Sequence, residues 1–347
     1  MREVAEQTMR EPGRGARAAS FTGRALLPIV AAAAVLVVLP PLWFGDEPFT
    51  TSLAVKALVF ASYGIGFNLI FGCTNQLFLC VGALAGVGGY GAAIFTNETS
   101  LPLGVGVAVG TAGAAIVGGL LSWIAVRRSL GIIFTGIVTL VFSLAFANLL
   151  LGLREYTGSE TGLILTAFPA KLADDRVGAY YLFAGLLVLF LLVFRVLQLS
   201  HVGWAFRGLR DDEMAAELAG VDVARYRIYA ATVGSAMIGL TGALSAYSVG
   251  FIQPSTYAFD QVDVRVLVLV AFGGLGTLLG PVIGAGVFAF VDEKLTTSLE
   301  LREVLYGIFV IAIFLGLRRG VVQTAVDLFN RLVGRRGKRP ALRTSRE

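Results

Sequence analysis

The feature that most constrains this chain is a series of apolar blocks, each long enough to cross a lipid bilayer as a helix. A membrane-spanning helix needs roughly 20 consecutive, mostly apolar residues, and soluble proteins rarely contain several such runs. Only 15% of the 347 residues are charged, and the mean hydropathy is +0.79. In soluble domains about a quarter of the residues are charged. The blocks therefore predict an all-α, polytopic membrane protein.

About 8–10 transmembrane helices are expected when each crossing is allotted roughly 20 residues. The predicted spans cover residues 25–44, 52–71, 76–96, 102–126, 131–152, 179–199, 228–250 and 303–317, with a longer apolar segment at 262–291.

The segment 262–291 is predicted to be broken or re-entrant, because glycines and a proline interrupt it in the stretch FGGLGTLLGPVIG. Broken backbone at membrane depth is tolerated only inside protein or beside a water-filled cavity. We therefore expect this segment at the translocation path or at a subunit interface. Two short crossings, a re-entrant hairpin and a kinked ordinary helix all remain open. The residues expected to break the helix are Gly273, Gly274, Gly276, Gly280 and Pro281.

Basic residues predict which side of the protein faces the cytoplasm, because cytoplasmic connections carry an excess of Lys and Arg. The connections at 127–128 and 200–227 are basic, as are an N-terminal arm at 1–24 and a tail at 318–347. The connection at 153–178 is neutral or acidic and is expected outside. Both termini are therefore predicted to be cytoplasmic.

The beginning of the chain admits a second interpretation, since a basic start followed by an apolar run also describes a signal peptide. The run at 25–44 is long for that purpose and no small-x-small cleavage pattern follows it. We expect it to be retained as the first span of a transmembrane domain at 25–317. The basic ends are explained by membrane orientation, so no nucleic-acid partner is expected. The chain is placed in the cell (inner or plasma) membrane as a multi-pass protein.

Several kinds of chemistry have no matching pattern in the sequence. There is no Walker A motif, and Cys73, Cys80 and His201 form neither a disulfide framework nor a metal pattern. The charged residues Asp263 and Asp292 lie near predicted ends of spans, and no carboxylate is expected in the middle of one. We therefore expect no enzymatic activity, no cofactor and no metal. If transport is active, its energy must come through a partner protein.

Polar residues within the apolar spans are candidates for lining a translocation path. Each of them can equally well bond one helix to another. These candidates are Asn68, Gln76, Thr139, Ser143 and Asn148.

The most charged interior stretch is GLRDDEMAAELAGVDVARYR at 208–227, within the connection 200–227 that we call the cytoplasmic cassette. Asp211 and Asp212 are expected to cap a short helix, and Gly220 to end it. Asp222 is expected to cap the next membrane helix.

The short helix of the cassette carries a narrow apolar stripe of Met214, Leu218 and Val221 beside Glu213 and Glu217. Such a helix fits a groove on a protein partner. A helix resting on lipid is the alternative, although anionic headgroups would repel the acidic residues. We expect a protein partner.

The cassette and three further stretches resemble segments of one protein family. LGIIFTGIVTLVFSLAF at 130–146, YTGSETGL at 156–163 and LVAFGGLGTLLGPVIGA at 269–285 match its segments in the same order. The family is the membrane permease subunit of branched-chain amino acid ABC transporters (LivM-like), and the resemblance covers roughly residues 50–320.

The resemblance implies a permease subunit of an ATP-driven importer for branched-chain amino acids or related small polar solutes. The implied partners are cytoplasmic ABC ATPases, an extracytoplasmic solute-binding protein docking at 153–178, membrane lipids, and a second permease subunit that is either a sister chain or a second copy. The loop helix at 207–220 would couple to the ATPases. The coupling residues implied are Arg207, Arg210, Asp211, Asp212, Glu213, Ala216 and Gly220.

Departures from the family pattern leave the solute open. Phe78, Cys80 and Val81 replace polar or very small residues, Ser143 stands where an acidic residue is common, and Trp204 replaces an arginine. A stand-alone channel or facilitator for a small solute is the alternative function. The choice between one chain or two in the permease pair stays open as well.

Overall fold

The computed structural model describes residues 29, 31–36, 48–99, 102–165, 176–296 and 307. The chain divides into two compact units, Met1–Glu47 and Pro48–Glu347. In the first unit residues 31–36 are helical. Most of the predicted spans 25–44 and 303–317, together with the arm 1–24 and the tail 318–347, lie outside the described residues, so these predictions stay untested.

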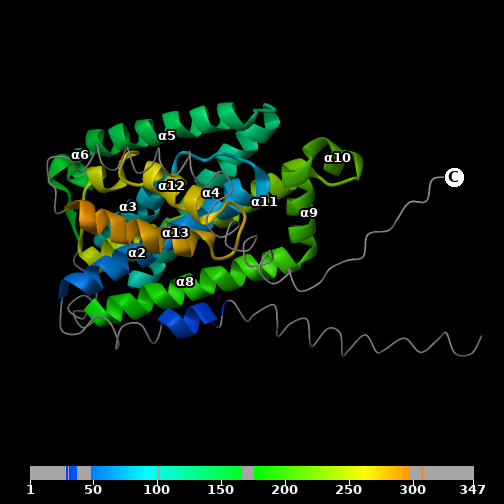
Figure 1. Ribbon diagram of the computed structural model, residues 1–347. Coiled ribbons are helices and arrows are strands. Elements are labelled where there is room, and N and C mark those ends of the chain that lie inside the picture. The colour runs from blue at the N-terminus through cyan, green and yellow to red at the C-terminus, as the bar shows by residue number, and fades with distance from the viewer. Residues whose placement is uncertain are drawn as a thin grey trace, which may run out of the picture. The chain divides into compact units, whose positions relative to one another are not determined.

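The second unit is built almost entirely of helices, as the sequence predicts (Figure 1). In chain order its elements are α2 (Pro48–Phe67), the π-helix η1 (Asn68–Gly72), α3 (Val81–Thr99), α4 (Leu103–Arg127), α5 (Ile132–Gly152), α6 (Arg154–Thr157), η2 (Ser159–Thr161), β1 (Leu163–Ile164), α8 (Arg176–Leu199), α9 (His201–Asp211), α10 (Glu213–Leu218), α11 (Val223–Val249), β2 (Phe251–Ile252), η3 (Pro254–Tyr257), α12 (Asp263–Gly273) and α13 (Gly280–Thr296).

Five of the described helices are long and apolar enough to cross a membrane. They are Thr50–Gly72, Leu103–Arg127, Ile132–Gly152, Val177–Leu199 and Val223–Val249, and each corresponds to a predicted span. The prediction for 76–96 began too early, because residues 75–80 are not helical and α3 starts at Val81. Asn75 has a positive φ of 55°, which interrupts helical backbone at that point.

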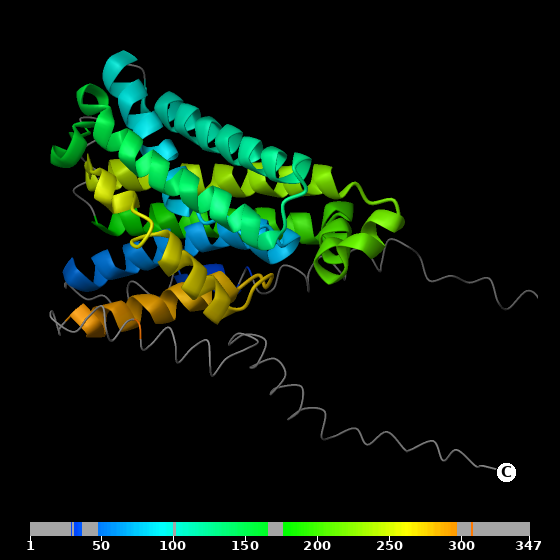
Figure 2. The same ribbon diagram turned by 90° about the horizontal axis from the view of Figure 1, so that it is seen from above.

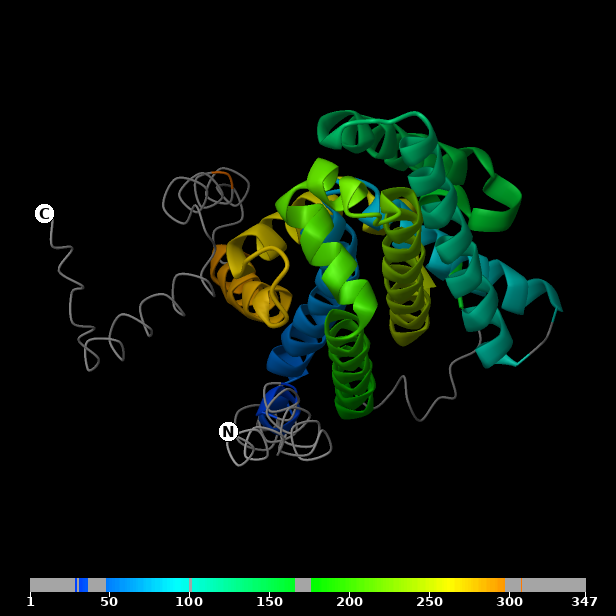
Figure 3. The same cartoon turned by 90° about the vertical axis from the view of Figure 1, so that its right-hand side faces the viewer.

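The core of the second unit lies where α11 packs against α3 and α4, and where α2 packs against α8 and α13. Figures 1 and 3 show α5 and α8 at opposite edges of this group. Glycines allow the closest approaches: a Cβ on Gly88 of α3 would lie 2.1 Å from the carbonyl oxygen of Gly239 in α11. A side chain on Gly88 would push α3 away from α11, and one on Gly239 would meet Ala114 of α4.

The segment 262–291 is broken, as predicted, into α12 and α13 with a connection at 274–279. Gly274 and Gly276 have φ angles of 113° and 73°, which only glycine adopts without strain. Both arms lie beside α2: a Cβ on Gly64 would contact Leu269 and Pro281, and Phe60 lies against Phe288. The structure therefore shows a hairpin rather than a kinked helix.

The two ends of α11 separate the cytoplasmic cassette from the predicted external loop. Beyond the C-terminal end of α11, β1 from the loop pairs antiparallel with β2, with Leu163 opposite Ile252. At the N-terminal end of α11 lie α9 and α10 (Figure 2). Since α11 has 27 residues, about 40 Å separate the two ends at 1.5 Å per residue. Residues 166–175 of the loop lie outside the described residues.

Candidate functional site: the cytoplasmic cassette and the broken segments

The helices of the cassette are capped by local interactions that the sequence predicts. Oδ1 of Asp212 accepts a hydrogen bond from the backbone N–H of Ala215 at 3.1 Å, which caps α10. Gly220 has φ of 86° and follows the last turn, while the N–H of Val221 bonds the carbonyl of Ala216. These bonds satisfy the final carbonyls of α10. Asp211 does not share in the capping, because it is the last residue of α9.

The apolar side chains of α10 point away from the chain. Met214 is 72% exposed and Leu218 is 85% exposed. Ala216, expected as a contact with a partner, is instead buried, and its Cβ faces Gly208 of α9. Ala216 thus holds α10 against α9, whereas Met214 and Leu218 form the accessible apolar surface.

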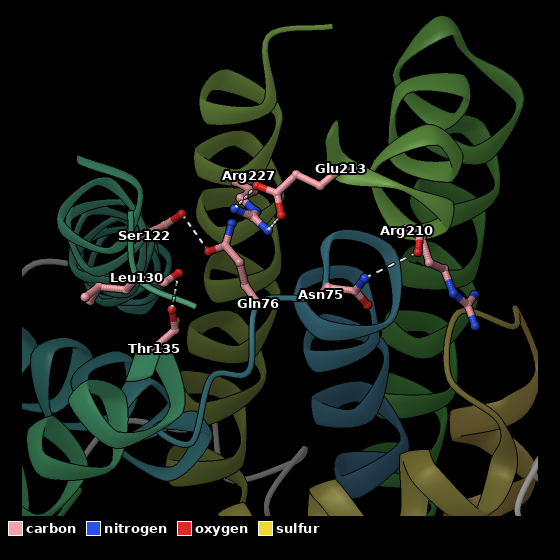
Figure 4. A network of polar contacts seen from close by, with 8 residues as sticks. All are labelled: Asn75, Gln76, Ser122, Leu130, Thr135, Arg210, Glu213 and Arg227. Atoms are coloured by element: carbon pink, nitrogen blue, oxygen red, sulfur yellow. Dashed lines mark hydrogen bonds and ion pairs between the residues drawn. The ribbon is translucent and has the colours of Figure 1, made fainter. Parts of the chain in front are cut away.

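Arg210 reaches from the end of α9 to the hairpin connection. Its Nη2 donates to the carbonyl oxygen of Leu275 at 3.1 Å, and its own carbonyl accepts from Nδ2 of Asn75 at 3.4 Å (Figure 4). A Cβ at Gly276 would overlap the guanidinium of Arg210. Arg210 is exposed, but it contacts both irregular segments, 75–80 and 274–279.

The other charged side chains of the cassette have different partners. Glu213 accepts two hydrogen bonds from Arg227 of α11, at 2.7 and 2.8 Å, and this ion pair fastens α10 to α11 (Figure 4). Arg207 is exposed and lies over the ring of Trp204, 4.5 Å from its centroid.

Gln76 lies directly beside this ion pair and is buried. Its Oε1 accepts from Oγ of Ser122 in α4 at 2.8 Å. Nε2 of Gln76 and Nε of Arg227 have no hydrogen-bond partner in the described part of the chain. Segment 75–80 thus carries polar groups to the C-terminal end of α4 and the N-terminal end of α11.

Asn68, the first residue of the π-helix η1, bonds the hairpin connection 274–279. Its Oδ1 accepts from the N–H of Gly276 at 2.6 Å, and its Nδ2 donates to the carbonyl of Thr277 at 2.9 Å. The side chain is fully buried. Both ends of the amide are therefore used to satisfy backbone that is not helical.

Thr139 and Ser143 connect α5 to the rest of the unit. Oγ1 of Thr139 accepts from the N–H of Leu79 at 2.9 Å, and Oγ of Ser143 donates to Oδ2 of Asp263 at 3.3 Å. Asn148, predicted to join them, is exposed and donates to the carbonyl of Leu144 in its own helix. Of the five predicted path residues, Asn148 is thus the one that lies apart.

Asp263 is buried, although the sequence did not identify it as a candidate site residue. It is near the end of its segment, as predicted, but that end lies beside Ser143 in the middle of α5. Its Oδ1 also accepts from the N–H of Gly82 in the first turn of α3 at 3.3 Å. The Asp263 carboxylate therefore caps a helix that begins far earlier in the chain.

A cavity of about 750 Å³ lies at the end of the unit opposite the cassette. It runs between α2, α8, α11 and η3, and its walls are mostly apolar. Oη of Tyr63 and Oγ of Ser245 lie 3.4 Å apart at its wall. Among the described residues, no group of His, Cys, Asp and Glu could hold a metal ion.

Comparison with known proteins identifies a family to which most of the chain is similar. The profile of the family described as "branched-chain amino acid transport system / permease component" matches residues 49–316. This range includes every described element from η1 to α13.

Individual relatives extend this similarity to most of the chain. The branched-chain amino acid permease LivM of Escherichia coli K12 is 27% identical over 299 residues, which are 78% of this chain and 70% of LivM. LivM of Salmonella typhimurium is 26% identical, over 74% of this chain and 66% of that protein. The chain thus spans about two thirds of the length of these relatives.

Two permeases named for other solutes are also similar. The autoinducer 2 import permease LsrC of Yersinia enterocolitica is 26% identical over 79% of this chain and 75% of its own length. The fructose import permease FrcC of Rhizobium meliloti is 29% identical over 39% of this chain and 41% of FrcC. No solved structure matches the chain significantly.

Proposed function

The chain belongs to the family of branched-chain amino acid transport system permease components, and on this basis we propose that it forms the membrane path of an ATP-driven importer. The family consists of transporter permeases rather than enzymes, and its place is the cell membrane, which fits the long apolar helices. Coupling, partners and solute are the parts that we propose.

The observation that carries the coupling proposal is the exposed apolar surface of α10. Met214 and Leu218 face away from the chain on the side that carries Arg207, Arg210, Arg225 and Arg227. Basic connections mark the cytoplasmic side, where the ATPases of an ABC importer reside. A short helix offering two large apolar side chains suits a groove on such a partner. Glu213 and Arg227 would hold α10 at a fixed angle during contact.

The remaining partners follow from the two ends of the molecule. A solute-binding protein would dock on the outer side, where the loop 153–178 meets β2. A second permease subunit, either a sister chain or a second copy, would complete the path. The buried polar side chains of Asn68, Gln76, Thr139 and Ser143 are the groups we propose beside that path.

Branched-chain amino acids are the solutes we propose, because the LivM relatives match most of the chain. The relatives LsrC and FrcC are named for import of autoinducer 2 and of fructose, so sugar-like solutes are a second candidate. The deciding measurement is binding of leucine, isoleucine, valine, amides and sugars to the cognate solute-binding protein. Tight binding of a sugar with no binding of aliphatic amino acids would contradict the proposal.

The coupling proposal is tested with Leu218→Asp, in which a charge replaces the most exposed apolar side chain of α10. Loss of one buried leucine costs about 1.5–3 kcal/mol, so co-purification of the ATPases should fall about tenfold or more. Leu218→Met keeps an apolar side chain and serves as the control. Unchanged co-purification of the ATPases with Leu218→Asp would rule out α10 as the contact.

A separate experiment addresses the stand-alone channel. The purified chain in lipid vesicles should neither concentrate leucine nor conduct it, because the energy and the second half of the path are missing. Downhill leucine flux through the chain alone would favour the channel, and accumulation without ATPases would contradict both functions.

A further inference from the structure

We propose that Arg210 is a positioning residue that transmits movement of the cytoplasmic cassette to the hairpin connection at 274–279. The inference rests on the proposed function, in which ATPases move the cassette. It reassigns Arg210 from a contact with the ATPase to a link inside the permease.

The first part of the link is the guanidinium itself. Arg210 is the second-last residue of α9, and its Nη2 donates to the carbonyl oxygen of Leu275 at 3.1 Å. Hydrogen bonds from a charged donor are stronger than those between neutral groups. Gly276 leaves no space for a side chain, since a Cβ there would overlap Nη1 of Arg210. The guanidinium is therefore packed on the connection as well as bonded to it.

The second part of the link consists of one bond to the end of α9 and one bond from the end of α8 to the connection. Nδ2 of Asn75, in the extended segment 75–80, donates to the carbonyl of Arg210 at 3.4 Å. Nε2 of Gln198, at the end of α8, lies 3.5 Å from the carbonyl oxygen of Gly276. The connection thus lies between the α8–α9 corner and the extended segment, so a rotation of α9 must displace one or both.

The third part of the link carries the displacement into the membrane domain. Asn68 binds Gly276 and Thr277 and lies at the point where α2 becomes the π-helix η1. At the other end of α12, Asp263 binds Gly82 of α3 and Ser143 of α5. Polar contacts at the two ends of α12 therefore tie the connection to the end of α2 and, through the rigid helix α12, to α3 and α5. Such a chain of contacts is the kind of network that can carry coupling between distant sites.

The neighbouring arginines do not have these contacts. Arg227 pairs with Glu213, and Arg207 lies over Trp204. Arg225 is exposed at the start of α11, and its backbone N–H donates to Oδ1 of Asp222. Arg225→Ala therefore removes one positive charge from the same end of the molecule without touching the hairpin, which makes it a matched control.

The test uses the full chain assembled with its ATPase partners in lipid vesicles, with solute uptake and ATP hydrolysis measured together. Arg210→Ala should keep ATPase co-purification and ATP hydrolysis, while solute taken up per ATP falls several-fold, because movement of the cassette is no longer passed to the connection. Arg210→Lys should retain part of the ratio, because its single ammonium can still reach a carbonyl. Arg225→Ala should behave like the original chain.

A variant on the hairpin side keeps the inference testable if Arg210→Ala does not fold. Gly276→Ala places a methyl group on the guanidinium and should lower the same ratio. Gly250→Ala is the control for backbone strain, because Gly250 has φ of 71° but no neighbour that a Cβ would meet.

Two results would overturn the inference while leaving the proposed function intact. One is a normal uptake-per-ATP ratio in both Arg210→Ala and Gly276→Ala. The other is loss of ATPase co-purification in Arg210→Ala, since Arg210 would then contact the ATPase directly. If the unaltered chain binds no ATPase, the proposed function fails and this inference falls with it.

Discussion

Oδ1 of Asn68 accepts a hydrogen bond from the N–H of Gly276 at 2.6 Å, across 208 positions of sequence. The bond joins the π-helix at the end of α2 to the connection between α12 and α13. Inside a bilayer, non-helical backbone has no water to bond and must be satisfied by protein. Asn68 supplies both an acceptor and a donor for this purpose and thereby satisfies two backbone groups of the connection.

Replacing Asn68 by leucine should destabilise the fold strongly. The N–H of Gly276 and the carbonyl of Thr277 would lose their partners, and each buried unsatisfied group costs about 1–3 kcal/mol. The measurement is thermal unfolding of the purified chain in detergent. Asn148→Leu is the control, because Asn148 is exposed and bonds its own helix. Equal melting temperatures for the two variants would refute the role of Asn68.

Asp263→Leu should destabilise more than Asp263→Asn. Asparagine keeps an oxygen that can accept from the N–H of Gly82, whereas leucine leaves that N–H and Oγ of Ser143 without their acceptor. We expect about 1–3 kcal/mol between the two variants, measured by unfolding in detergent. A leucine variant as stable as the asparagine variant would show that the carboxylate is not needed as a cap.

Gly88→Ala should loosen the packing of α3 against α11, because its Cβ would lie 2.1 Å from the carbonyl oxygen of Gly239. Gly286→Ala in α13 meets no atom within 4 Å and should be neutral or gain about 0.5–1 kcal/mol from helix propensity. Opposite shifts of the melting temperature are therefore expected from the same chemical change. A stabilised Gly88→Ala would contradict the close approach of α3 and α11.

The pairing of Glu213 with Arg227 predicts rescue by charge exchange. Glu213→Arg places two cations together and should loosen α10, which is measurable as faster proteolysis of the cassette. Adding Arg227→Glu should restore part of the protection, although Glu213 is partly exposed and the gain is about 1 kcal/mol or less. High salt should weaken both effects. Absence of any rescue at low salt would mean that the ion pair does not hold α10.

Local sequence patterns predicted much of the fold. The apolar blocks fixed the all-α membrane class, because a bilayer admits long apolar segments only as satisfied helices. Gly274 and Gly276 predicted the break in 262–291, since their φ angles exclude other residues. Asp212, Gly220 and Asp222 predicted the ends of the cassette helices, because capping bonds span only a few residues.

The site depended on contacts that no local pattern encodes. Arg210, Asn68 and Asp263 each bind a group more than 60 residues away, and only the packing of the helices brings those groups together. Tertiary packing likewise turned Ala216 inward and left Asn148 exposed. Sequence alone thus predicted the five long apolar helices and the caps of the cassette helices, since these are set by solvation and short-range bonds. Only the tertiary structure decided which polar groups meet, because irregular backbone inside a bilayer takes its partners from wherever the fold places them.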